Sequence, residues 1–450
     1  MPGDGAIGSP PDGFRGRLVC LVDYQHRAQV LSNGLRFHTV AMPHLHTAFL
    51  GFYARVGSRH ESPETNGLSH FLEHMYFRGC RILPSSQALN GAIEDLGGSL
   101  DGFTARDYTG FQTVLHPSGL RDGLAIMGAM LREPRFDGVE VERRVVREEM
   151  LDALDERGRV VELDAVAHRH HFGRHGLGQP IEGTRGNLRR FDREALQLHR
   201  NRFYGAQNTV LVAAGPLGHG LRSMAEKAFG VLVRGRRRGD GPRPGRLGPT
   251  SRFRFVHHRG PQTRVRWSFR AVPERHIDYP ALIWLRRWFD GGLSARLQVE
   301  LVDRLGLAYE VAAGLDAYSD VGVFDFEMVV ANDKLPLAVT ELDRVVRDAR
   351  NRSFTADEVE SIKRRARASF AGMLDAPSEL GHWLGLGALF STLEPPERRL
   401  SRLLAIGADD LHRAARRTFR PDGLTVSAVG GASPRVVVET KRVLRDVLRS

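Results

Sequence analysis

The residues best placed to do chemistry are two histidines and a glutamate in the segment His70-Phe-Leu-Glu73-His74. Helical residues four apart lie only about 40° apart around the axis, so His70 and His74 would project from one face and could share a metal ion. Glu73 leans toward the same face, where its carboxylate could take a proton from an attacking water. The order HxxEH reverses the zinc-binding sequence HExxH and predicts metal-assisted hydrolysis.

A catalytic zinc site needs a third protein ligand, and a predicted helix over residues 139–154 offers three glutamates. Glu142 and Glu149 share a face because they are about two turns apart, whereas Glu148 points about 100° away. We therefore predict Glu149 as the third ligand of one Zn²⁺ per chain, with Glu142 supporting the site from behind. Two plainer interpretations stay open: a chance HxxEH match among 19 histidines, and a solvated acidic helix face.

A second group of histidines lies in the segment HRHHFGRH, at residues 168–175. Its histidines are separated by two, one and four residues with arginines between them, and this spacing disfavours a bound cation. We interpret His168, His170, His171 and His175 as surface or packing residues.

Hydrophobic periodicity and turn residues predict the elements that must position these side chains. A β-hairpin with a turn at Ser32-Asn33-Gly34 opens the chain. Strands are predicted over residues 47–56 and 104–115, and helices over 67–77, 85–96 and 139–154. The second half repeats this order, with strands over 264–271, 309–313 and 322–330 and helices over 279–289 and 355–374. Many α+β domains share this rhythm, but the repetition favours two duplicated α+β domains.

A Gly-, Pro- and Arg-rich segment, RGRRRGDGPRPGRLGPTS, separates the two halves. We therefore predict a disordered lead-in over residues 1–20, a zinc-binding domain over 21–233, a linker over 234–251 and a second domain over 252–450. A chain of 450 residues suits two such domains.

The composition limits the partners and the compartment. No apolar run approaches the roughly 20 residues that span a bilayer, and the N-terminus has no apolar signal segment, so no membrane association is expected. Two cysteines, Cys20 and Cys80, exclude a disulfide framework and fit a cytoplasmic location. The net charge of +12 comes almost entirely from arginines spread along the chain, so we predict no nucleic-acid partner; an acidic substrate is as consistent with this charge.

The stretch RVGSRHESPETNGLSHFLEHMYFRG, from Arg55 to Gly79, resembles the zinc-binding segment of the pitrilysin/insulinase family of inverzincin peptidases. It is most similar to the branch of bacterial processing-type peptidases and mitochondrial processing peptidase. The similarity covers most of the chain from about Val30 onward. Further matching segments are residues 101–104 with 108–109, 142–150, 178–183, 204–215, 292–297 and 306–309.

The resemblance implies two homologous domains, each a mainly antiparallel sheet covered by helices, that close on a peptide chamber. It implies His70, His74 and Glu149 as zinc ligands and Glu73 as general base, with Glu142 as the supporting acid. The substrate would add as a β-strand to an edge near Ser99, Leu100, Asp101, Gly102 and Phe103. At this edge the family usually shows Asn-Ala where this chain has Asp101-Gly102.

A second departure concerns the partner. Family members that work alone place an Arg seven residues before the Tyr of the GLAY segment, and the pair steadies the substrate and the developing oxyanion. Here Tyr309 matches that tyrosine, but Val302 stands at the Arg position, and neither Arg296 nor Arg304 matches it. Other members divide the labour between two subunits. A dimer is therefore expected, favouring a heterodimer with a homologue that supplies the Arg/Tyr pair.

The sequence thus predicts a zinc-dependent endopeptidase that processes extended peptides. The alternative from another class is a non-catalytic scaffold or partner subunit, and the intact HFLEH with Glu149 argues against it. Nucleic-acid binding would rest on net charge alone.

Overall fold

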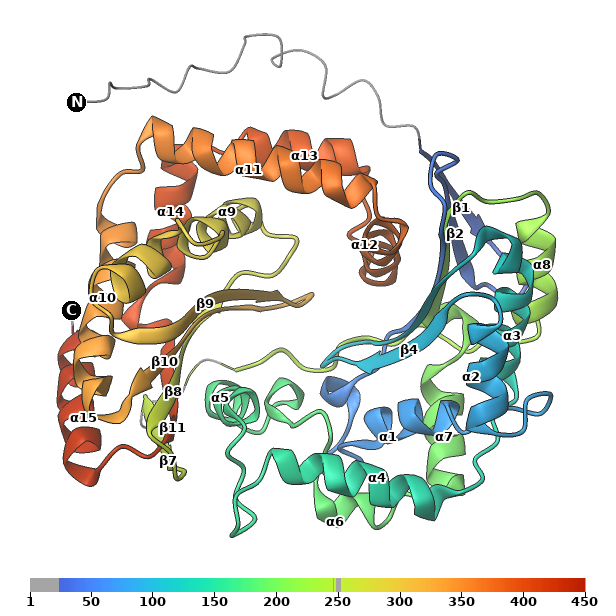
Figure 1. The fold of residues 1–450 in the computed structure, drawn as a ribbon, viewed down its shortest axis with the longest axis horizontal. Helices are drawn as coiled ribbons and strands as arrows, with labels where there is room; N and C mark the ends of the chain where they lie inside the picture. The colour runs from blue at the N-terminus through green and yellow to red at the C-terminus, as the bar shows by residue number, and fades with distance from the viewer. Residues whose placement is uncertain (1–23, 246, 248–251, 450) are drawn as a thin grey trace, which may run out of the picture.

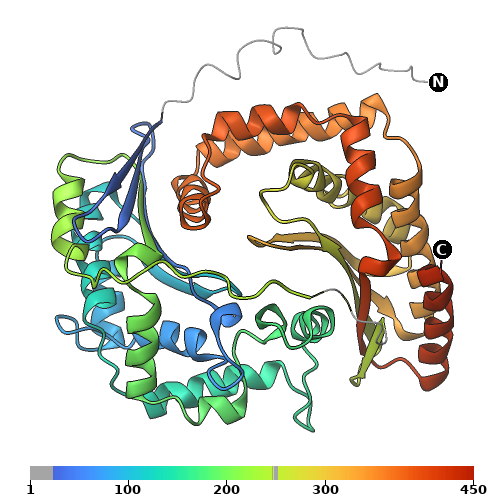
Figure 2. The same ribbon diagram turned by 180° about the vertical axis from the view of Figure 1, so that it is seen from behind.

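The computed structural model describes residues 24–245, 247 and 252–449, and the predicted lead-in over residues 1–20 lies outside them. Two β-sheets face each other across the molecule, and each is covered on its outer side by helices (Figures 1 and 2). No helix of the described residues is both long and apolar enough to cross a membrane.

The first sheet has six strands in the order β1-β2-β6-β3-β5-β4, and β4 forms one edge. Its neighbours are antiparallel except for the parallel pair β2 and β6. The strands are β1 (Gln25–Val30), β2 (Arg36–Ala41), β3 (Ala48–Ala54), β4 (Ser99–Thr104), β5 (Thr109–Leu115) and β6 (Thr209–Gly215). The helices of this half are α1 (Leu68–Tyr76), α2 (Ser86–Glu94), α3 (Leu120–Arg132), α4 (Val139–Asp152), α5 (Leu163–Phe172), α6 (Arg185–Leu188), α7 (Arg193–Phe203) and α8 (Leu221–Phe229).

The second sheet has five strands in the order β7-β11-β8-β10-β9, again with one parallel pair, β7 and β11. The strands are β7 (Phe253–His257), β8 (Gln262–Ala271), β9 (Ala308–Ala317), β10 (Gly322–Ala331) and β11 (Leu424–Gly430). The helices are α9 (Tyr279–Phe289), α10 (Leu335–Asn351), α11 (Ala356–Leu374), α12 (Pro377–Phe390), α13 (Pro396–Leu404), α14 (Ala408–Thr418) and α15 (Pro434–Arg449).

The two sheets share one topology. If β1 is left out and the other five strands of the first sheet are counted in chain order, they lie side by side in the order first, fifth, second, fourth, third. The five strands of the second sheet lie in the same order, and in both sheets the first and fifth strands form the parallel pair. The predicted fold class, two duplicated α+β domains with mainly antiparallel sheets, is confirmed. The single strand predicted over residues 104–115 is interrupted in the structure. Thr104 is the last residue of β4, residues 105–108 form the turn, and β5 begins at Thr109.

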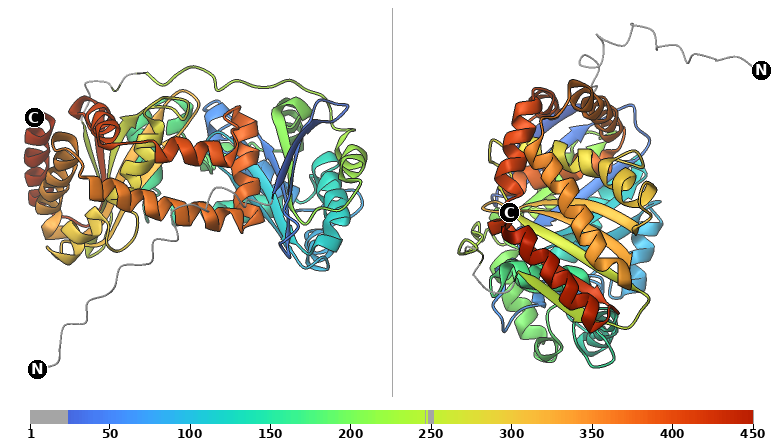
Figure 3. Two further views of the ribbon diagram at one scale, coloured as in Figure 1. Left: turned by 90° about the horizontal axis from the view of Figure 1, so that it is seen from above. Right: turned by 90° about the vertical axis from the view of Figure 1, so that its left-hand side faces the viewer.

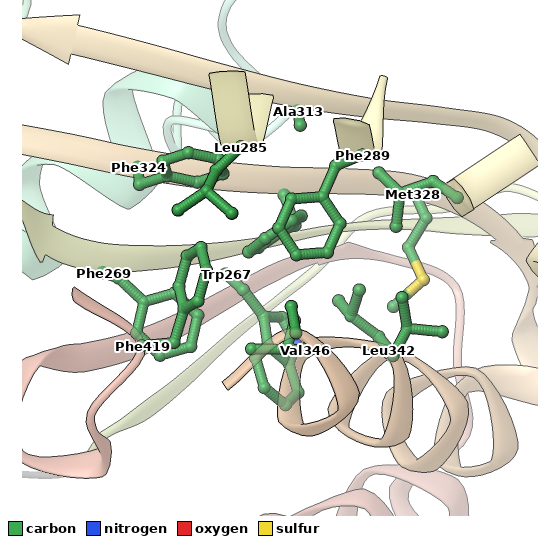
Figure 4. Close-up of a cluster of buried hydrophobic side chains, with 14 of the residues drawn as sticks. Trp267, Phe269, Leu285, Phe289, Ala313, Phe324, Met328, Leu342, Val346 and Phe419 are labelled. Carbon is green, nitrogen blue, oxygen red and sulfur yellow. The ribbon is translucent and has the colours of Figure 1, made fainter. Parts of the chain in front are cut away.

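Aromatic side chains from sheet and helices fill the core of the second half (Figure 4). Phe269 of β8 and Phe324 of β10 meet Phe289 of α9 and Phe419, and Trp267 is fully buried beside them. Such large apolar surfaces, removed from water, are the main source of stability for each layer.

The two halves exchange a helix. Helix α5 packs on β8 and β11 of the second sheet, and α12 packs on β3 and β6 of the first. Helices α11 and α13 span the distance between the second half and α12 (Figures 1 and 3). Leu380 and Leu384 of α12 are buried in one cluster with Phe49 and Tyr53 of β3, so the halves are joined by apolar burial.

Two glycines let α12 lie directly on the first sheet. A Cβ atom on Gly381 would come within 2.4 Å of the Phe49 ring, and one on Gly385 within 2.5 Å of the Tyr53 ring. Because these glycines are four residues apart, they form one flat stripe along the helix.

Ion pairs and hydrogen bonds also hold the junction. Asp164 of α5 binds Arg106 of the first half and Arg266 of β8, each at 2.5 Å. Asp240, in the predicted linker, binds Arg55 at 2.6 Å and accepts a hydrogen bond from Ser319.

The histidines of α5 belong to the same junction. His171 and His170 each share a hydrogen bond with a β11 hydroxyl, of Thr425 at 2.8 Å and Ser427 at 3.0 Å. His168 is buried against Asp164. These histidines therefore pack between the halves, and among the described residues they are not part of a cluster that could bind a metal.

Candidate metal centre

Helix α1 presents the HxxEH residues on one side, and α4 lies across it. The nitrogen Nε2 of His70 lies 3.3 Å from Nε2 of His74. The Glu149 carboxylate of α4 completes the group, with one oxygen 3.6 Å from His70 Nε2 and the other 3.4 Å from His74 Nε2. These three residues form the only group of metal-binding type found in the described part of the chain.

The spacing of these atoms fits a zinc ion. In a tetrahedral site with bonds of about 2.0–2.1 Å, neighbouring ligand atoms lie about 3.4 Å apart. The three observed separations, 3.3, 3.4 and 3.6 Å, cluster around that value. Three protein ligands leave a fourth position for water or substrate, which is the arrangement of catalytic zinc sites.

The two imidazoles differ in their surroundings. Burial, with a smaller effect of His74, lowers the pKa of His70 to about 4. Burial would also lower the pKa of His74, but hydrogen bonds to Glu142 and Glu149 and nearby carboxylate charge outweigh it and raise that pKa to about 10.

Glu142 supports His74 from behind. Its carboxylate lies 2.9 Å from His74 Nδ1, which leaves Nε2 of that ring facing the metal position. Arg78 lies 3.7 Å from the other oxygen of Glu142. The structure thus brings Glu142 to the place that the sequence predicted, and Glu148 has no part in the group.

Glu73 lies between the metal group and the edge strand β4. Its carboxylate accepts a hydrogen bond from the Thr104 hydroxyl at 3.0 Å. Burial raises the pKa of Glu73, although His74 and the Thr104 hydrogen bond oppose this effect. A Cβ atom on Gly102 would lie 2.8 Å from a Glu73 oxygen, so the backbone of β4 passes directly beside the carboxylate.

Strand β4 contains the predicted substrate-binding residues Ser99, Leu100, Asp101, Gly102 and Phe103. It pairs with β5 on one side and has no strand partner on the other among the described residues. Its free backbone N–H and C=O groups could therefore pair with an extended peptide beside Glu73.

Tyr309 is not brought to the metal group. It lies near the start of β9, at the opposite end of that strand from the β9–β10 turn, and its side chain is 79 % exposed. Val302 packs against the core of the second half. Arg296 and Arg304 are both held in ion pairs, by Asp348 and Glu300 respectively.

A buried carboxylate that no sequence motif indicates holds the start of α1. Glu61 accepts hydrogen bonds from the backbone N–H groups of Gly67 at 2.8 Å and Ser69 at 2.6 Å, and from the Asn66 amide at 3.0 Å. It thus satisfies N–H groups that a helix leaves unpaired at its N-terminus. Burial raises the pKa of Glu61, while these hydrogen bonds oppose that effect.

Helix α6 and the loop before it hold the same segment. Asn187 donates to the backbone oxygens of Pro63 at 2.8 Å and Asn66 at 3.0 Å. Gly67 has a φ of 98°, and a Cβ atom there would lie 2.5 Å from the Glu182 carbonyl oxygen. Gly183, with a φ of 78°, is the other side of this contact, since a Cβ atom there would lie 2.2 Å from the Asn66 carbonyl oxygen. The two glycines, which favour such φ values, are the sequence signals of this close approach.

Comparison with known proteins identifies related chains. Residues 36–185 match the family model described as "Insulinase (Peptidase family M16)", and residues 190–366 match "Peptidase M16 inactive domain". An "Uncharacterized zinc protease" of Mycobacterium tuberculosis is 32% identical over 424 residues, which cover 90% of each chain.

Solved structures share the fold. A protease from Helicobacter pylori superposes with a TM-score of 0.81 at 20% identity, covering 90% of this chain and 99% of that one. A chain of complex III from Candida albicans superposes with a TM-score of 0.75 at 14% identity, covering 94% and 99%.

Proposed function

We propose that this chain, which belongs to the M16 (insulinase) family of peptidases, is a zinc-dependent endopeptidase that cleaves extended peptides. The observation that carries the proposal is the spacing of three ligand atoms, at 3.3–3.6 Å, next to a buried carboxylate and a free strand edge. His70, His74 and Glu149 would hold the zinc ion.

A bound zinc ion would polarise the scissile carbonyl and lower the pKa of a water molecule. Glu73 takes the proton from the attacking water and then gives it to the leaving amine. Its raised pKa suits both steps, because a buried carboxyl beside Thr104 can hold a proton between them. Glu142 keeps the His74 ring oriented through the 2.9 Å contact with Nδ1.

Strand β4 holds the substrate. An extended peptide that pairs with its free edge would pass Glu73, because Gly102 brings the β4 backbone against that carboxylate. Main-chain hydrogen bonds bind a peptide with little regard to its side chains. The substrates are therefore peptides long enough to form a strand.

The enzyme is proposed to work as a dimer. Tyr309 is exposed and lies away from the metal group of its own chain. Val302 stands where the arginine would be, and the nearby Arg296 and Arg304 are engaged in ion pairs with Asp348 and Glu300 of their own chain. A homologous chain with an Arg/Tyr pair would supply this function.

We also propose a cytoplasmic location and two domains, with limits at residues 21–233 and 252–450.

The second candidate is a non-catalytic subunit of a larger assembly, which the fold similarity to a complex III chain favours. The two candidate functions predict different effects of replacing Glu73. If the chain is the enzyme, Glu73→Gln keeps one zinc per chain and loses peptidase activity by a factor of about 10²–10⁴.

The assay uses unfolded polypeptide substrates, with and without a homologue that carries the Arg/Tyr pair, and zinc content is measured on the same samples. Equal activity of the Glu73→Gln variant and the parent chain would show that Glu73 is not the base. Stoichiometric zinc without any activity in either setting would favour the scaffold.

A further inference from the structure

A cavity of about 850 Å³ lies at the seam between the halves, lined by α5, the segments on either side of it, residues 63–66 and strand β7. No residue of the metal group or of β4 lines it. Five of its lining residues carry basic side chains, namely Arg159, Arg169, Arg174, Arg254 and His257. In Figure 1, β7 and α5 lie on the same side of the molecule, opposite α11 and α13.

The positive charge of this cavity is not balanced within its lining. No Asp or Glu of the described residues lines it. Arg159 binds Asp155, and Arg169 donates to the Gly173 carbonyl oxygen at 3.0 Å. Arg174 and Arg254 are exposed and have no hydrogen-bond or ion-pair partner in the described part of the chain. Two guanidinium groups from different halves are thus free to bind an anion.

The floor of the cavity is apolar. Val256 of β7 packs with Val166 of α5 in a small cluster between the halves. Phe253 is buried in the core of the second half, and Phe255, which also lines the cavity, packs partly against that core. Side chains alternate along a strand, so Arg254 shares the face of Val256 and points toward the cavity side. Strand β7 is also an edge strand, paired only with β11 among the described residues.

We infer that this cavity binds an acidic peptide segment. Carboxylates of the peptide pair with Arg174 and Arg254, and its apolar side chains rest on Val166 and Val256. The cavity presents charged arginines beside apolar valines, and this mixture favours a peptide over a nucleic acid. The phosphates of a nucleic acid would leave the apolar floor uncovered. A cavity of about 850 Å³ has room for a short segment. The site is separate from the metal centre, so binding does not depend on the zinc chemistry.

The test measures fluorescence anisotropy of a labelled short peptide of alternating glutamate and leucine, with a lysine–leucine peptide as the comparison. The full chain carries Glu73→Gln in every sample, so that no peptide is cleaved. We expect saturable binding of the glutamate peptide only, and a Kd raised about fivefold or more by R174Q with R254Q. The control, R121Q with R222Q, removes two exposed arginines of α3 and α8 and leaves the Kd unchanged.

Other outcomes overturn the proposal. The proposal is wrong if the lysine peptide binds as tightly as the glutamate peptide, or if the control variant loses as much affinity as R174Q with R254Q. It is also wrong if single-stranded DNA at equal concentration displaces the glutamate peptide. Adding His74→Ala separates the two sites. Unchanged peptide binding in a chain that has lost its zinc supports an independent cavity, whereas parallel loss of both assigns the peptide to the metal centre.

Discussion

At the scale of single residues, the arrangement of His70, His74 and Glu149 depends on two other carboxylates. Glu142 orients His74, and Glu61 holds the first N–H groups of α1. The first contact sets which ring nitrogen faces the metal position, and the second sets where the helix begins. Both carboxylates are buried, so their removal leaves polar groups without partners in a place that water does not reach easily.

Glu142→Gln is expected to weaken zinc binding about 10–100-fold, because an amide orients His74 less strongly than a carboxylate. The measurement is competition for zinc with a chelator of known affinity. Glu148→Gln on the same helix is the matched control and should bind zinc as the parent does. Equal affinity of the two variants would argue against a role for Glu142.

Glu61→Ala is expected to destabilise the chain by about 1–3 kcal/mol for each N–H group left unpaired at Gly67 and Ser69. Glu61→Gln keeps an acceptor oxygen and should lose less. Urea unfolding of the zinc-free chains gives the change in free energy, with the exposed Glu64→Ala as control. The account of α1 fails if Glu61→Ala unfolds at the same urea concentration as that control.

At the scale of elements, the sequence predicts what is local. The apolar spacing of residues 67–77 gives the helix that carries His70 and His74, and the structure has α1 within those limits. Glu61 could not be found this way, because it lies six residues before the helix N-cap Gly67 and caps the helix through a loop. The approach of Glu149 to the two imidazoles depends on how α4 packs on α1, which periodicity alone does not determine.

The exchange of α5 and α12 also lies beyond local patterns, since it joins residues that are hundreds of positions apart. The packing of α12 on the first sheet predicts a loss of stability when a larger residue replaces a glycine of the stripe. Gly381→Val should cost about 1–3 kcal/mol, because its side chain would overlap the Phe49 ring. Gly372→Ala on α11 is the control, with nothing within 4 Å of the added atom, and should be neutral or slightly stabilising.

Thermal unfolding of the two glycine variants under one buffer measures this difference. A Gly381→Val chain as stable as Gly372→Ala would mean that α12 does not lie on the first sheet in solution.

At the scale of the whole molecule, two carboxylates tie the halves together. Burial alone would raise the pKa values of Asp164 and Asp240, but hydrogen bonds and charges from neighbouring histidine and arginine side chains outweigh it. Both pKa values therefore lie well below the ordinary value of 3.8. Each group binds its proton less readily in the folded chain than in the unfolded one.

This difference in proton binding decides how the stability of the fold changes with pH. The stability that these groups contribute is complete above about pH 4 and is lost as the pH falls further. We expect the Tm to drop below pH 4, and to drop less steeply in a chain with Asp164→Asn and Asp240→Asn. Calorimetry over a pH series measures both slopes. Parallel slopes in the two chains would remove these carboxylates from the acid response.

The central claim is that His70, His74 and Glu149 bind one zinc ion, and a zinc-edge anomalous difference map of crystals grown with zinc tests it most directly. We predict one strong peak per chain within about 2.0–2.2 Å of Nε2 of both histidines and of a Glu149 carboxylate oxygen. A peak at other residues, or no peak between these three side chains at saturating zinc, would contradict the account.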